Sequence, residues 1–125
     1  MKEPYNPRKS LLYNFIYAWQ GVKILVKTQL NAKIHVLATF AVVLLGLTLK
    51  LSYGEWALIT IAIALVWITE AVNTAFEMLM DKITPEYDPI TEKIKDISAA
   101  AVLFAAILAV LVGIFVLVPK LNSIF

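Results

Sequence analysis

Four polar side chains lie in or beside an apolar stretch of this chain, and their types suit proton transfer and metal binding. Glu70, Asn73 and Glu77 lie inside the apolar run at residues 56–80, and Asp81 follows directly after it. An ionisable group near the centre of a membrane helix costs roughly 2.5–3.5 kcal/mol on insertion scales. We infer from this cost that the chain uses these groups for a function.

The four residues fall on one face if the run is a helix. At about 100° per residue they span an arc of about 80°. Towards the helix start, the same face is apolar and carries Ile63 and Val66. A rise of about 1.5 Å per residue places Glu70 about 10 Å deeper than Glu77. This arrangement predicts a site that opens on one side of the membrane, with a lipid-borne group deep inside and a water-soluble group at its mouth.

Each carboxyl group has a candidate role at its depth. Burial in a low dielectric disfavours the charged carboxylate, so Glu70 is suited to accept a proton. Glu77 lies nearer to water and is suited to bind a divalent cation, with Asn73 supplying a neutral oxygen or a hydrogen bond. The alternative is that Glu70 and Asn73 only join helices through hydrogen bonds. Helix packing does not need a row of acids, so a functional site is the favoured interpretation.

The composition predicts an all-α integral membrane protein. The chain has 125 residues, 61% of them hydrophobic, with a mean hydropathy of +0.81. A soluble domain of this size has no room to bury so much apolar surface. The absence of cysteine excludes disulfides and thiolate metal sites, and a net charge of +2 argues against a nucleic-acid partner. We predict one membrane domain over residues 1–125.

The apolar runs predict three transmembrane helices, at residues 34–50, 56–80 and 97–118. Residues 81–96 are expected to form a charged loop, because they contain Pro85 and Pro89 among charged side chains. Nine Lys and Arg residues lie before the first span or in this loop, against only Lys50 and Lys120 on the other side. The positive-inside rule therefore places the N-terminus and the 81–96 loop in the cytoplasm and the C-terminus outside.

Residues 9–33 have a different pattern, which predicts an amphipathic helix on the membrane surface. One apolar stripe recurs at spacings of three and four: Leu12, Phe15, Ile16, Trp19, Val22, Val26 and Leu30. Lys23 falls on the stripe and Leu25 falls off it. An interfacial helix is the favoured interpretation, and a partly buried fourth helix is the alternative.

Small residues at four-residue spacing mark packing faces on the last two spans: Ala71 and Ala75, then Ala101, Ala105, Ala109 and Gly113. Three spans from one chain form a bundle too thin to enclose a charged site. We therefore predict an oligomer with sites between subunits.

Two further positions have alternative interpretations. In one interpretation, Asp96 or Ser98 caps the third span while Lys93 and Lys95 anchor to lipid headgroups. In the alternative, which is equally favoured, Lys95 contacts a phosphate group below Glu77. His35 has no His or Cys partner for a metal, so an interfacial anchor is its expected role.

Two sequence runs carry a family resemblance. The run E-A-V-N-T-A-F-E at residues 70–77, followed by Asp81 and by K-D-I-S-A-A-A-V at residues 95–102, resembles the signature of the bacterial diacylglycerol kinase / undecaprenol kinase family. The resemblance extends over nearly the whole chain. It implies a homotrimeric lipid kinase of the bacterial cytoplasmic (inner) membrane, which moves the γ-phosphoryl group of Mg-ATP onto the hydroxyl of diacylglycerol or undecaprenol.

The resemblance also implies roles for individual residues. Glu70 resembles the family residue that acts as the catalytic base, and Asn73 lies beside it. Glu77 resembles the family residue that binds Mg²⁺ and nucleotide. Further ATP contacts are implied at Tyr17, Gln29, Glu86, Tyr87, Asp88, Lys95 and Asp96, and lipid contacts at Glu70, Ser98 and Trp19.

The chain departs from the family pattern at Gln29, where a second metal-binding glutamate is usual. Asn31 and His35 match the pattern E-x-N-x-x-x-H of the undecaprenol branch, so the alignment holds. Gln29 keeps an oxygen ligand but loses the charge. We expect an active kinase with a weaker or differently completed metal site; a catalytically impaired member is the alternative. Ser98-Ala99 replaces the Gly-Ser of some members.

Two other functions are compatible with intramembrane acids. A small proton- or cation-coupled transporter is one, but transport predicts a polar stripe across the whole bilayer, and this stripe stops at Glu70. A purely structural oligomer is the other, and it has no use for Lys95-Asp96.

Overall fold

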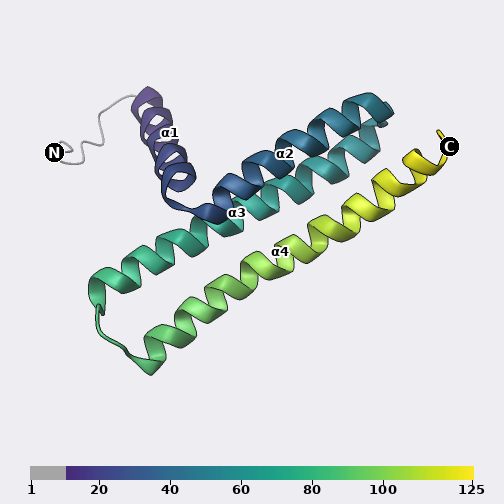
Figure 1. Ribbon diagram of the computed structural model, residues 1–125. Helices are drawn as coiled ribbons and strands as arrows, with labels where there is room; N and C mark the ends of the chain where they lie inside the picture. The colour runs from purple at the N-terminus through teal and green to yellow at the C-terminus, as the bar shows by residue number, and fades with distance from the viewer. Residues whose placement is uncertain (1–10) are drawn as a thin grey trace.

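The computed structural model describes residues 11–125, which form four helices. These are α1 (Leu11–Thr28), α2 (Leu30–Leu49), α3 (Tyr53–Ile83) and α4 (Pro89–Asn122). α3 and α4 form a long antiparallel hairpin, α2 lies along part of α3, and α1 leaves the bundle at an angle (Figure 1). The all-helical architecture is confirmed, while Lys9 and Ser10 of the predicted surface helix lie outside the described residues.

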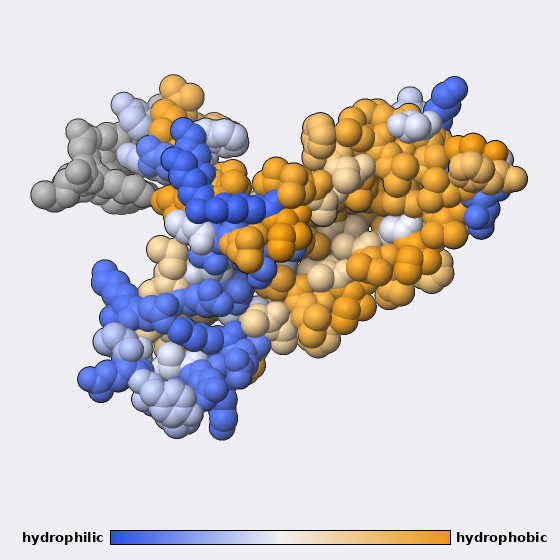
Figure 2. Space-filling view, in the orientation of Figure 1, coloured by the Kyte–Doolittle hydropathy of each residue, from blue (hydrophilic) through white to orange (hydrophobic). Residues whose placement is uncertain are grey.

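Three of these helices are long and apolar enough to cross a membrane: α2, α3 and α4. Figure 2 shows apolar residues over the half of the molecule away from the α3–α4 connection and hydrophilic residues gathered around that connection. This distribution is that of a multi-pass membrane protein, as predicted.

The boundary between the first two helices lies earlier than predicted. Gln29 is extended (φ −107°, ψ 122°), so α1 ends at Thr28 and residues 30–33 belong to α2 instead of the surface helix. The backbone N–H of Lys33 donates to the carbonyl of Gln29, which closes the first turn of α2. The predicted boundary after residue 33 therefore lies four residues beyond the backbone break at Gln29.

α1 does not bury the predicted apolar stripe within this chain. Phe15 is 67% exposed and Trp19 60% exposed, whereas Leu25, which lies off the stripe, is buried. Most of the stripe is therefore exposed within this chain, and an interfacial position of α1 in the bilayer stays a prediction.

α3 begins at Tyr53, three residues before the predicted span. Ser52 and Glu55 form a capping box: the backbone N–H of Glu55 donates to Ser52 Oγ (3.2 Å), and that of Ser52 donates to Glu55 Oε2 (2.8 Å). This S-x-x-E signature satisfies backbone donors that are otherwise unpaired at a helix start. Residues 52–54, which lie between two predicted spans, are thus a cap and the first residues of the helix.

α4 begins at Pro89, so the predicted 81–96 loop is wrong in extent and only residues 84–88 lie between helices. Asp88, not Asp96 or Ser98, is the N-cap, and its carboxylate accepts from the Thr91 backbone N–H at 2.8 Å. Pro89 does not break this helix because the first helical position needs no backbone N–H donor.

At the other end of the bundle, α2, α3 and α4 share an apolar core of Leu49, Leu51, Ile59 and Val116. Lys120 near the end of α4 lies 3.3 Å from Glu55 of the capping box. The hairpin is thus fastened at its open end by packing and by one ion pair.

Gly46 is expected to be indispensable for this core. A Cβ at this position would lie 2.6 Å from Trp56 Cη2 and 3.0 Å from Leu51 Cδ1. Gly46→Ala should therefore lower the free energy of unfolding by about 1–3 kcal/mol, as overpacked cores do. Unfolding in mixed micelles, followed by circular dichroism, measures the loss. Gly113→Ala is the matched control, since its Cβ meets nothing within 4 Å; equal stability of the two variants would contradict the expected clash.

Candidate active site

The buried face of α3 changes from apolar to polar partway along the helix. Ile59, Ala62 and Val66 are buried on the half towards the capping box, and Glu70, Asn73 and Thr74 are buried on the half towards the α3–α4 connection. Exposure then rises along the polar row, from 1% at Glu70 to a half-buried Glu77 and an exposed Asp81. The row thus leads from a dry interior to the polar end of the molecule.

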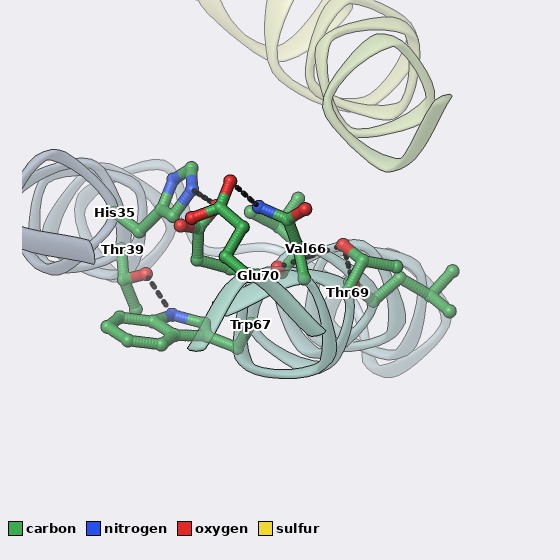
Figure 3. Close-up of polar contacts among 9 residues, drawn as sticks. His35, Thr39, Val66, Trp67, Thr69 and Glu70 are labelled. Carbon is green, nitrogen blue, oxygen red and sulfur yellow. Dashed lines mark hydrogen bonds and ion pairs between the residues drawn. The ribbon is translucent and has the colours of Figure 1, made fainter. Parts of the chain in front are cut away.

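Glu70 faces α2. It is the largest fully buried side chain in residues 11–125, and its Oε2 lies 3.6 Å from Nε2 of His35 (Figure 3). His35, which was expected to be an interfacial anchor, instead turns its imidazole towards this carboxylate.

Trp67 holds the imidazole from α3. Its ring meets the His35 ring edge-on, with centroids 6.0 Å apart and planes at 66°. Its indole Nε1–H donates to Thr39 Oγ1 of α2 at 3.1 Å (Figure 3). The α2–α3 interface therefore contains a chain of contacts from Thr39 through Trp67 and His35 to Glu70.

Asn73 faces the opposite neighbour, α4. Ser98 Oγ donates to Asn73 Oδ1 at 2.5 Å, and Asn73 Nδ2 donates to Glu77 Oε1 at 3.4 Å. The amide oxygen of Asn73 thus accepts a hydrogen bond from α4, and its amide nitrogen donates one to the next carboxylate of the row. Asn73 thus connects Ser98 of α4 to Glu77 of α3 through two hydrogen bonds.

A polar cleft of about 300 Å³ lies below this row, where α3 and α4 connect. It is lined by Asp81, Thr84, Pro85, Thr91 and Glu92, and by five of the predicted nucleotide contacts, Glu86, Tyr87, Asp88, Lys95 and Asp96. Lys95 forms an ion pair with Asp81 across the two helices.

Hydrogen bonds at the rim of the cleft fix its charges. The backbone N–H and the hydroxyl of Thr91 donate to Asp88 and lower the pKa of its carboxyl group. The Tyr87 hydroxyl donates to Glu92 Oε2 at 2.9 Å, which raises the pKa of Tyr87. Asp88 is therefore anionic and Tyr87 a neutral donor at neutral pH.

The residues of α1 stay apart from this cleft. Tyr17 is 40% and Trp19 60% exposed, and neither is among the residues that line the clefts described here. The half of α3 towards the α3–α4 connection instead meets α1 across a groove of about 390 Å³, lined by Ala18 and Gly21 on one side and by Ala71, Thr74 and Ala75 on the other. The predicted small residues Ala71 and Ala75 thus face α1.

A metal ion fits the donor chemistry only together with phosphate oxygens. Within residues 11–125, no group of three or more His, Cys, Asp or Glu side chains is placed to hold a metal by itself. Mg²⁺ usually takes one or two carboxylates together with substrate phosphates and waters. The half-buried Glu77 offers a carboxylate, and Gln29, whose Nε2 donates to Thr28 Oγ1 at 3.3 Å, keeps its amide oxygen for such a role. These residues fit an ion that arrives with a nucleotide.

Sequence reasoning missed the role of the α2 side chains. His35 and Thr39 are four residues apart and so share a helix face. That spacing was the available signal, but it did not reveal which face of α3 the pair would meet.

Known proteins match the chain over most of its length. The family model described as prokaryotic diacylglycerol kinase matches residues 16–117. Undecaprenol kinase of Bacillus subtilis is 31% identical over 120 residues, which are 96% of this chain and 98% of that protein. Diacylglycerol kinase of Synechocystis sp. is 37% identical over 98% of this chain and 71% of its own length. Diacylglycerol kinase of Escherichia coli K12 is 30% identical over 76% of this chain and 78% of its own length.

Proposed function

The chain belongs to the prokaryotic diacylglycerol kinase family and is a membrane lipid kinase, and we propose that it transfers the γ-phosphoryl group of ATP to the hydroxyl of diacylglycerol or undecaprenol. The observation that carries this proposal is the single row from buried Glu70 to the polar cleft. An acceptor dissolved in the bilayer reaches the deep end, and a nucleotide reaches the shallow end.

Glu70 is the general base of the proposed reaction. The lipid oxygen attacks the γ-phosphorus, the bond from that phosphorus to the β–γ bridging oxygen breaks, and ADP leaves. The hydroxyl proton passes to the Glu70 carboxylate. Asn73 is fixed by Ser98 and Glu77, so its amide lies beside the reacting hydroxyl without moving. Phosphoryl transfer depends mainly on such positioning and on charge neutralisation.

The nucleotide occupies the cleft at the α3–α4 connection. Lys95 is the cation of its lining, and it exchanges Asp81 for a phosphate oxygen when ATP binds. Glu86, Tyr87, Asp88 and Asp96 surround the rest of the nucleotide. Tyr17 lies apart from this cleft within one chain, so in the proposal it contacts the nucleotide from α1 of a neighbouring subunit. Glu77 and Gln29 would hold Mg²⁺, and the ion would supply charge neutralisation on the phosphates, as it does in this class of reaction.

A homotrimer with sites between subunits is part of the proposal. In one chain α1 leans away from the hairpin, and its apolar stripe is exposed. A neighbouring subunit supplies the missing wall and brings α1 residues such as Trp19 to the lipid. We also propose the bacterial inner membrane as the location, with the cleft and the N-terminus in the cytoplasm, because nine of the 11 Lys and Arg residues precede residue 34 or lie within residues 81–96.

A transporter is not favoured. Beyond Glu70 the buried face of α3 consists of Val66, Ala62 and Ile59, and none of these side chains binds or relays an ion. An ion path needs polar groups across the whole bilayer.

Transfer of labelled phosphate to a single purified lipid tests the proposed acceptor. The protein is placed in vesicles that contain either undecaprenol or diacylglycerol, together with γ-labelled ATP and Mg²⁺. Label in one or both lipids is the expected result, and the rate ratio identifies the preferred alcohol. Label in neither lipid would overturn the proposed acceptor class.

Restoring a carboxylate at Gln29 is expected to strengthen the metal site. Gln29→Glu should lower the Mg²⁺ concentration for half-maximal kinase activity severalfold, because two carboxylates then face the ion in place of one. A Mg²⁺ titration of activity measures this. Gln20→Glu, on an exposed face of α1, adds the same charge elsewhere and should leave the titration unchanged. An unchanged Mg²⁺ dependence in Gln29→Glu would contradict the metal role of this position.

A further inference from the structure

We propose that His35 is a positioning residue for the catalytic carboxylate, with its Nε2–H donating to Glu70 Oε2 during the reaction. The inference rests on the proposed function, since it assigns a partner to the residue that acts there as the base. It concerns α2, to which the sequence patterns of the α3–α4 signature give no role.

The first observation is a pair of unsatisfied atoms that face one another. Within residues 11–125, the buried side-chain nitrogen and oxygen atoms without a hydrogen-bond partner are His35 Nε2, Glu70 Oε2 and Thr74 Oγ1. The first two lie 3.6 Å apart, just beyond hydrogen-bond distance. Buried polar atoms are nearly always paired. A small rotation of either side chain pairs both atoms at once.

The second observation is that the imidazole is held in place. Trp67 packs edge-on against the ring, and the indole is itself tied to Thr39 one turn along α2 from His35. The His35 side chain is only 18% exposed and that of Glu70 2%. In this position the ring presents Nε2 to the carboxylate.

The chemistry of the base requires such a donor. A carboxylate must be ionised to take a proton, and a hydrogen bond to its charged form favours that form in a dry interior. With Nε2–H bound to Oε2, the other carboxylate oxygen is left for the lipid hydroxyl. The hydroxyl proton passes to that oxygen, and His35 keeps its own proton throughout. The same arrangement orients a histidine in other carboxylate–histidine pairs.

Nitrogen NMR tests the contact directly, because His35 is the only histidine of the chain. In the full-length protein with ¹⁵N-labelled histidine, we expect a protonated Nε2 whose signal shifts in Glu70→Gln. Glu77→Gln removes a carboxylate from the same row without touching His35, and should leave the signal in place. An Nε2 signal with the same chemical shift in Glu70→Gln as in the unmutated protein would overturn the contact.

Kinetics test the role. His35→Ala should lower kcat by about 10- to 100-fold, the effect of losing one hydrogen bond to a charged group, with KM for ATP and lipid unchanged. His35→Gln places an amide donor in the same region and should recover part of kcat. Val36→Ala, on the exposed side of the same turn, should match the unmutated protein.

The outcomes separate the two proposals. Absence of kinase activity in the unmutated protein overturns the proposed function, while the NMR comparison still decides the contact. An active protein whose kcat is unchanged in His35→Ala overturns the positioning role. Losses of equal size in His35→Ala and His35→Gln also overturn it, because they indicate ring packing instead of hydrogen-bond donation.

Discussion

Glu70→Gln is expected to lower kcat by about 10²- to 10⁴-fold, the usual contribution of a positioned general base. Glutamine has nearly the same size and keeps the polar contacts of the pocket, but it cannot take the hydroxyl proton. The site is fully buried, so water has no ready access to act in its place. Steady-state kinetics in vesicles, with lipid and ATP both varied, measures the loss.

The expected pattern is a fall in kcat with little change in KM for ATP, because the nucleotide cleft lies at the other end of the row. Glu55→Gln is the control, since it removes a carboxylate from the same helix at the opposite end of the hairpin. It should alter stability through the capping box and the Lys120 pair while keeping kcat. If Glu70→Gln kept full activity, Glu70 would not be the base.

Glu77→Gln is expected to have the second large effect. Of the two residues assigned to Mg²⁺, Gln29 is neutral, so Glu77 supplies the only carboxylate of the pair. The substitution removes the charge that attracts the ion, while the glutamine amide oxygen can still accept from Asn73 Nδ2. We expect at least a hundredfold loss of kcat/KM, of the order produced by disturbing metal ligation.

Raised Mg²⁺ should rescue part of this loss, because weaker binding is offset by mass action. Activity of Glu77→Gln is therefore measured over a range of Mg²⁺, beside Glu92→Gln at the rim of the cleft. Glu92 accepts from Tyr87 and has no assigned metal role, so its substitution should leave the Mg²⁺ dependence intact. An identical Mg²⁺ dependence in the two variants would contradict the role of Glu77.

The sequence was sufficient to predict the membrane class and the three apolar helices, because hydrophobic length is a direct physical requirement for crossing a bilayer. It predicted the helix ends poorly. Ser52 and Asp88 are caps, and Pro89 lies where a proline is tolerated, yet all three lie outside the predicted spans. Hydrophobic periodicity reports which face is buried, whereas helix ends depend on a few side-chain hydrogen bonds to the backbone.

The site shows the same division between local and long-range information. That Glu70, Asn73 and Glu77 share one face of α3 follows from helix geometry alone. Their partners do not, since Ser98 and His35 come from other helices and their contacts depend on packing. α1 is the clearest example: its periodic stripe is exposed within the chain, and Leu25 outside the stripe is buried.

In the proposed reaction, the buried Glu70 of α3 deprotonates an alcohol dissolved in the bilayer while ATP is bound at the polar end of the hairpin. Transfer of γ-labelled phosphate to lipid, with nucleotide binding measured in the same vesicles, tests it most directly. We expect labelled lipid from the unmutated protein and, from Glu70→Gln, nearly none despite normal ATP binding. Equal labelling by the two proteins, or loss of ATP binding in Glu70→Gln, would contradict it.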